Sequence, residues 1–187
     1  EMLGVDLLIP DVTYLKDKKD KIKGMVLTHG HEDHIGGLPY ILPQLPEFPL
    51  YTAKLTAALA EDKLSEYNIK RQINIVGTGG TIQIGIFTIT FIRVSHSIPD
   101  TMHLSIKTPV GQIYHGADFK FDFTPVDGKQ PDLISIGQAG AQGVKLLISD
   151  SLGSERSGAT KSEKTLDDMF EREISSCKGK FIVTTMS

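Results

Sequence analysis

Three of the six histidines in this 187-residue chain lie in one hexapeptide, His29-Gly30-His31-Glu32-Asp33-His34. Imidazole and carboxylate groups are the usual protein ligands of zinc and similar divalent ions, and catalytic metal sites leave one position open for water. In a loop that follows a strand, these side chains can converge on an ion from several directions, because Gly30 adds no bulk between two of them. The alternative is a polar surface loop whose histidines cluster by chance. We interpret the hexapeptide as part of a metal centre.

Three single residues farther along the chain have suitable chemistry but are ambiguous by themselves. His96 precedes a Pro-Asp turn and could be an ordinary surface residue. Asp118 could be a turn aspartate, and Asp150, which follows an apolar run, could cap the turn after a strand. His103 and His115 are interpreted as structural. Composition and spacing alone therefore leave the rest of the ligand set open.

The hexapeptide and three other segments carry a family resemblance. Residues 28–37 match the His-x-His-x-Asp-His motif of the metallo-β-lactamase fold. The resemblance is closer still to the ribonuclease J family, in the β-CASP branch of that fold, because three further segments look like that family in the same order and at similar separations: 4–11, 96–100 and 118–128. The resemblance covers nearly the whole chain.

This resemblance implies a ligand set for two metal ions. One ion would be held by His29, His31 and His96. The second would be held by Asp33 and His34, with Asp118 between the two ions. The implied cofactor is a pair of divalent ions, zinc or else manganese, about 3.5–4 Å apart.

The resemblance also implies a reaction, which is hydrolysis of phosphodiester bonds in single-stranded RNA by a metal-dependent ribonuclease. The nucleophile would be a hydroxide bridging the ions, since two ions lower the pKa of a shared water towards neutrality. Asp33 would also orient this nucleophile, and Asp150 would support the site by fixing a ligand or proton donor. Two alternatives remain open: a hydrolase of small esters, thioesters or lactams on the same fold, and a non-catalytic scaffold that binds RNA or protein.

Hydrophobic patterns place these residues on a mixed scaffold. Short apolar or β-branched runs predict strands at 22–28, 73–76, 81–84, 87–94, 104–108, 112–117 and 144–149, with the first and last of them buried. Helices are predicted at 38–45, 53–66, 132–140 and around 166–174, where apolar residues recur on one face. Thr52 is expected to cap the second of these helices. The ligand segments at 29–34, 96 and 118 each follow a predicted strand.

The fold class is therefore α/β (α+β), and the resemblance specifies a metallo-β-lactamase-like αββα sandwich. We interpret residues 1–187 as one partial domain, incomplete at both ends, because the chain lacks an initial Met and stops in a β-branched run. Residues 179–187 would begin the strand that leads into a missing β-CASP domain. A late histidine ligand and a proton donor of the family would then be absent. We expect the isolated chain to bind metal weakly and to cleave little RNA.

Composition narrows the remaining function classes. With 40% hydrophobic and 23% charged residues, the chain is neither disordered nor membrane-spanning, and its net charge of −3 does not decide its partner. The single cysteine, Cys177, excludes an internal disulfide and a cysteine-based zinc cluster. No signal-like segment is visible, so a cytoplasmic location without a membrane partner is expected. The resemblance also implies a homo-oligomer for the full-length protein.

Overall fold

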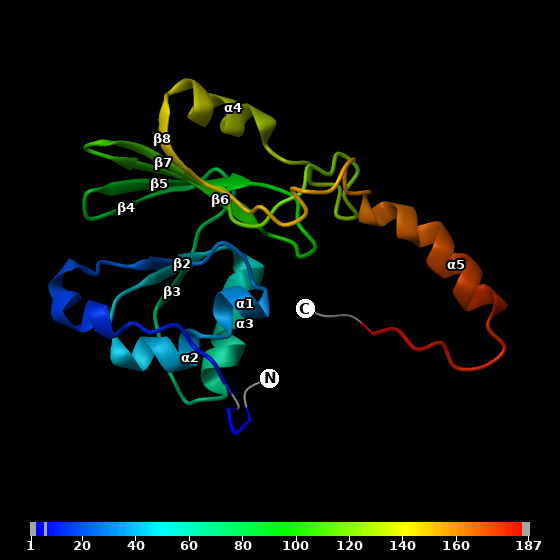
Figure 1. The fold of residues 1–187 in the computed structure, drawn as a ribbon, viewed down its shortest axis with the longest axis horizontal. Helices are drawn as coiled ribbons and strands as arrows, with labels where there is room; N and C mark the ends of the chain where they lie inside the picture. The colour runs from blue at the N-terminus through cyan, green and yellow to red at the C-terminus, as the bar shows by residue number, and fades with distance from the viewer. Residues whose placement is uncertain (1–2, 6, 185–187) are drawn as a thin grey trace.

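Two β-sheets form the centre of the molecule in the computed structural model, which describes residues 3–5 and 7–184 (Figure 1). The smaller sheet is parallel, with the order β1 (Met25–Val26), β2 (Leu50–Thr52) and β3 (Ile73–Ile75). The larger sheet is antiparallel from its first to its fourth strand, with the fifth parallel to the fourth. Its strands follow chain order: β4 (Thr81–Ile84), β5 (Phe87–Arg93), β6 (Met102–Thr108), β7 (Gly111–His115) and β8 (Val144–Ile148).

Helices cover the outer faces of the two sheets (Figure 1). Beside the smaller sheet lie η1 (Thr13–Lys21), α1 (Glu32–Ile35), α2 (Leu38–Ile41), η2 (Leu42–Gln44) and α3 (Lys54–Ser65). The larger sheet is covered by α4 (Leu133–Ala141), whereas η3 (Glu163–Leu166) and α5 (Asp167–Ser176) lead away from the sheets (Figure 1). The layers are therefore helix, sheet, sheet and helix.

Three apolar clusters hold these layers together. The cluster between the sheets is built around the fully buried Phe91, with Met102 and Leu104 beside it. A second cluster joins the smaller sheet to its helices, and a third joins α4 to the larger sheet through Ile92 and Tyr114. Burial of apolar surface on both faces of each sheet is what stabilises such a stack. The predicted αββα arrangement is confirmed.

The strand ends bring three distant chain segments to one edge of the sandwich. The histidine hexapeptide follows β1, His96 follows β5, and Asp118 follows β7. The amide of Met102, at the start of β6, donates a hydrogen bond of 3.2 Å to the carbonyl of Thr28. This bond joins the loop after β1 in one sheet to the larger sheet.

The predicted cap of the helix at 53–66 is wrong, although the helix is present as α3. Thr52 ends β2 instead, and its buried Oγ1 donates a hydrogen bond of 2.8 Å to the carbonyl of Leu27. The N-cap position belongs to Ala53, whose methyl group cannot accept a hydrogen bond. The local sequence thus provides no side-chain cap for α3.

The predicted burial of the strand at 144–149 is also wrong. β8 is an edge strand, and Leu146, Leu147 and Ile148 are 50%, 63% and 45% exposed. An apolar run does not distinguish a central strand from an edge strand. The helix predicted around 166–174 is present as α5, but Met169 and Ile174 on its apolar face are exposed.

The last predicted strand, at 179–187, falls partly outside the described residues. Residues 177–184 form neither helix nor strand, and residues 185–187 are not described. The role of this segment as the start of a β-CASP domain stays a prediction. Among the helices of the described residues, none has the length and apolar character that crossing a bilayer requires.

Candidate metal centre

His29 is the fully buried member of the histidine cluster. Its Nδ1 lies 3.0 Å from the hydroxyl of Thr28, and its Nε2 has no hydrogen-bond partner among the described residues. Buried polar atoms nearly always have a partner, so an orphaned imidazole nitrogen fits a metal ligand. Burial first, and then the neighbouring imidazoles, lower the pKa of His29 to about 3. The ring is therefore neutral, which is the form that binds metal.

The short helix α1 presents the other members of the hexapeptide. His31 is its N-cap residue with extended backbone, and Glu32 and Asp33 occupy the first turn, where carboxylates favour the positive helix end. The Nδ1 of His31 lies 3.1 Å from Nε2 of His96, which belongs to the loop after β5. Burial first, and then His31, lower the pKa of His96. Two histidines 65 residues apart are thus brought into direct contact.

Asp118 is the acidic centre of the cluster. Its Oδ2 lies 3.4 Å from Nε2 of His34, 3.7 Å from Nε2 of His96 and 3.9 Å from Nε2 of His29. The preceding Ala117 has a φ of +45°, in the left-handed region, and its amide donates to Nδ1 of His115 at 3.2 Å. Strained backbone of this kind often occurs at functional sites. The turn after β7 aims one carboxylate at three imidazoles.

These side chains form two overlapping groups whose ligand atoms lie within 4.8 Å of one another. The first group is His29, His31 and His96, and the second is His29, His34 and Asp118. Nitrogen and carboxylate ligands at such separations suit a divalent cation of the zinc class. The side chains of the two groups could therefore hold divalent metal ions.

Two of the predicted site residues lie outside both groups. Asp33 is 77% exposed, although its Oδ2 lies 3.5 Å from Nε2 of His34. Asp150 follows β8, and its Oδ1 accepts a hydrogen bond of 2.7 Å from the amide of Leu152. That contact is the turn-capping arrangement considered as the alternative for Asp150. The structure thus brings together His29, His31, His34, His96 and Asp118.

Sequence reasoning missed two hydroxyl residues beside the cluster. The buried Thr28 contacts His29, and Oγ of Ser97 lies 3.3 Å from Nε2 of His31. The only indication in the sequence that these two residues belong to the site is that each adjoins a candidate histidine. His103, interpreted as structural, is buried and its Nδ1 lies 2.9 Å from the hydroxyl of Tyr114.

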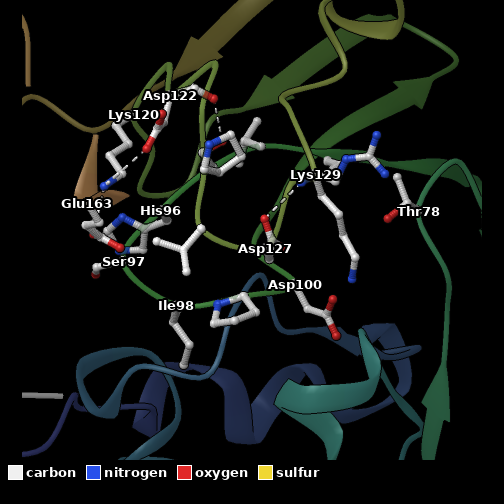
Figure 2. Close-up of a pocket in the computed structure, with 16 residues that line it drawn as sticks. Thr78, His96, Ser97, Ile98, Asp100, Lys120, Asp122, Asp127, Lys129 and Glu163 are labelled. Atoms are coloured by element: carbon white, nitrogen blue, oxygen red, sulfur yellow. Dashed lines mark hydrogen bonds and ion pairs between the residues drawn. The ribbon is translucent and has the colours of Figure 1, made fainter. Parts of the chain in front are cut away.

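A cavity of about 280 Å³ adjoins the cluster at His96 (Figure 2). Its wall includes Lys120, whose Nζ lies 2.7 Å from Glu163 and 3.9 Å from Asp122. Because two carboxylates face it, the charge of Lys120 is compensated. Lys129 and Asp127 line the opposite side of the cavity (Figure 2). The cavity is therefore polar and mixed in charge.

Comparison with known proteins identifies the fold that carries this cluster. A family model described as a β-lactamase superfamily domain matches residues 4–139. The chain belongs to the β-lactamase superfamily. The predicted metallo-β-lactamase-like sandwich is thus confirmed by the match and by the layers described above.

Curated relatives of this superfamily member are named ribonuclease J. The protein of Thermus thermophilus is 45% identical over all of this chain and 34% of its own length. Those of Helicobacter pylori and Synechocystis are 43% and 42% identical, again over the whole chain and over 27% and 30% of their lengths. The resemblance to the ribonuclease J family is confirmed. The chain spans 27–34% of the length of these relatives.

Solved structures agree with the fold. A protein of unknown function from Enterococcus faecalis matches with a TM-score of 0.61 and 18% identity, over 81% of this chain and 39% of its own. A diphosphatase of the PhnP family matches with a TM-score of 0.53 and 20% identity, over 74% and 52%. At these identities, the likeness concerns the fold alone.

Proposed function

We propose that this chain supplies the metal centre of a ribonuclease J-like enzyme that hydrolyses phosphodiester bonds in single-stranded RNA. The observation that carries the proposal is the convergence of Asp118 and three imidazoles on one point, each within 3.9 Å of the carboxylate Oδ2. The names of the curated relatives support the substrate class.

In this proposal the two overlapping groups correspond to two neighbouring ion positions. Two divalent ions there would lower the pKa of a shared water and stabilise the oxygens that gain charge when a phosphodiester is attacked. His31 and His96 belong to one position and His34 to the other, with Asp118 facing both. His29 belongs to both groups, whereas the resemblance assigned it to the first alone.

The other residues have supporting roles in the proposal. Asp33, beside His34, would be a ligand of the second position and would orient the attacking water. Thr28 contacts Nδ1 of His29 and so leaves Nε2 as the nitrogen that would hold a metal. Asp150 acts on the site through its turn and not as a ligand.

We propose the identity of the metal ions and the cellular location on chemical grounds. A set of imidazoles with one or two carboxylates suits zinc, and manganese is the second choice. A chain with one cysteine fits the reducing cytoplasm. We also propose that the full-length protein is a homo-oligomer.

The test combines metal content with cleavage. Elemental analysis of the purified chain should find zinc or manganese that a chelator removes and that His31→Ala fails to retain. Glu61→Ala, which changes an exposed acid on α3, is the control. The metal-loaded chain and a full-length version are then given 5′-monophosphorylated single-stranded RNA, a chromogenic lactam and a thioester.

The outcomes distinguish the three candidate functions. Cleavage of RNA alone supports the ribonuclease. Hydrolysis of the lactam or thioester without RNA cleavage would favour a small-molecule hydrolase. A folded chain that binds neither metal under saturating conditions contradicts the proposed centre and favours a scaffold.

A further inference from the structure

The loop between β5 and β6 carries His96 at one end and Asp100 at the other (Figure 2). Asp100 has a φ of +63°, in the left-handed region that residues other than glycine adopt uncommonly. Within the loop, the hydroxyl of Thr101 donates to the carbonyl of Ile98 at 3.0 Å, and Val94 donates its amide to the carbonyl of Thr101 at 3.2 Å. The loop is therefore closed on itself, and Asp100 lies in the turn at its end.

The carboxylate of Asp100 makes a contact outside the loop. Its Oδ2 accepts a hydrogen bond of 3.2 Å from the amide of Leu55, the second residue of α3. The N-cap residue Ala53 makes no side-chain hydrogen bond to the first turn. Free amides and the positive end of the helix dipole favour an anionic acceptor at this place. Asp100 thus caps α3 from 45 residues away.

The same helix also supports the other ligand loop. A Cβ on Gly30 would lie 2.5 Å from Cδ1 of Leu59 and 3.6 Å from Cα of Thr56, so this loop lies directly on α3. The carboxylate of Glu32 accepts a bond of 2.8 Å from Nζ of Lys63, near the far end of α3. One helix therefore seats both the hexapeptide and, through Asp100, the loop of His96.

We propose that Asp100 is a positioning residue of the metal centre: by capping α3, it fixes the loop that places His96 against His31. This inference rests on the proposed metal centre. Asp100 acts on His96 through the loop, because its carboxylate already accepts a hydrogen bond from the amide of Leu55. Without the bond, the loop loses its only side-chain tie to α3 among the hydrogen bonds of the described residues, and the imidazole of His96 is held less firmly against His31.

The experiment compares Asp100→Ala, Asp100→Asn and Asp100→Gly in the 187-residue chain. Zinc affinity and stoichiometry are measured by titration against a chromophoric chelator, and hydrogen exchange of the Leu55 amide is followed by NMR. We expect Asp100→Ala to weaken zinc binding by about 10–100-fold, the usual effect of removing a group that orients a ligand. Asn retains an acceptor oxygen and should recover most of the affinity.

The glycine variant separates the hydrogen bond from the backbone conformation. Glycine adopts the left-handed φ without strain but has no acceptor, so Asp100→Gly should lose zinc affinity as alanine does and exchange the Leu55 amide faster. Zinc binding at wild-type strength by a folded glycine or alanine variant would overturn the proposal. If the alanine variant does not fold, the comparison of Asn with Gly decides the question in the same way.

Two controls distinguish a failure of the proposed role of Asp100 from a failure of the proposed metal centre. Glu61→Ala removes an acidic side chain from the exposed surface of α3 and should bind zinc like the wild type. Urea unfolding of the metal-free variants reports the purely structural cost of the lost cap. A wild-type chain that takes up no zinc contradicts the proposed centre and the role of Asp100 together, whereas normal binding that is insensitive to Asp100 contradicts only the latter.

Discussion

The amide of Lys120 donates a hydrogen bond of 2.8 Å to the carbonyl of Ser95. The bond joins the segment that follows Asp118 to the residue before His96, so that the two segments form an isolated antiparallel bridge. The hydroxyl of Ser95 adds a second bond, of 3.2 Å, to the carbonyl of Asp122. The loops that carry Asp118 and His96 are therefore held together by hydrogen bonds that do not involve the side chains of these two residues.

The side chain of Lys120 should stabilise this junction. In Lys120→Met, the carboxylate of Asp122, only 4% exposed, loses its cation and Glu163 loses its 2.7 Å partner. Leaving a buried charged group without its partner costs about 1–3 kcal/mol or more, and we expect a loss of that size in the free energy of unfolding. Urea denaturation measures it. Lys120→Arg should recover part of the loss, and Lys129→Met, at an exposed lysine, should change little. Equal stability of the Met variant and the wild type would contradict the role.

The two aspartates of the proposed ligand set should differ in importance. Asp118 faces three imidazoles, whereas Asp33 is mostly exposed and contacts His34 alone. Asp118→Asn removes a charge that faces imidazoles of both groups, so we expect zinc affinity to fall at least about 10-fold, and further than in Asp33→Asn. Titration of both variants with zinc measures the difference. An equal or larger loss in Asp33→Asn would mean that Asp33 turns inward when metal binds.

The sequence predicted the hexapeptide, the strand-rich centre and the helix α3, because each depends on residues close together in the chain. The family resemblance brought His96 and Asp118 to the hexapeptide, but the sequence could not predict the other side chains that meet across the loops. The contact of Asp100 with Leu55 spans 45 residues and that of Lys120 with Glu163 spans 43. The exposure of β8 could not be predicted either, because an edge strand and a central strand can have the same apolar run. The hydroxyl of Thr52 could cap a helix, but in the structure it donates its hydrogen bond to the carbonyl of Leu27.

His103 should make stability depend on pH without belonging to the ligand groups. Burial first, and then His115, lower its pKa from 6.5 to about 4. Because the folded pKa is the lower one, protons bind preferentially to the unfolded chain. The contribution of His103 is therefore fully present above about pH 6.5 and is lost as the pH falls towards 4. At about 1.4 kcal/mol per pKa unit, the loss amounts to about 3 kcal/mol.

A glutamine variant isolates this titration. His103→Gln cannot titrate but can still contact the hydroxyl of Tyr114, which lies 2.9 Å from the native Nδ1. Urea unfolding of both chains at about pH 7 and about pH 4.5 should show a smaller pH effect in the variant. His29, whose pKa is also lowered, is present in both chains and cancels in the comparison. A difference in stability that stays constant between the two pH values would contradict the assignment.

Gly30 tests how closely the hexapeptide must approach α3. In Gly30→Ala the new methyl group would lie 2.5 Å from Cδ1 of Leu59, so either that side chain moves or the loop lifts away from the helix. Overpacking of this kind costs about 1–3 kcal/mol, and we expect a destabilisation in that range together with weaker zinc binding. Leu59→Ala removes the obstructing atom. The double variant should therefore be less destabilised than the sum of the two single changes, with a coupling of at least about 0.5 kcal/mol in a double-mutant cycle. Additive losses would show that the alanine methyl disturbs the loop for a reason other than its contact with Leu59.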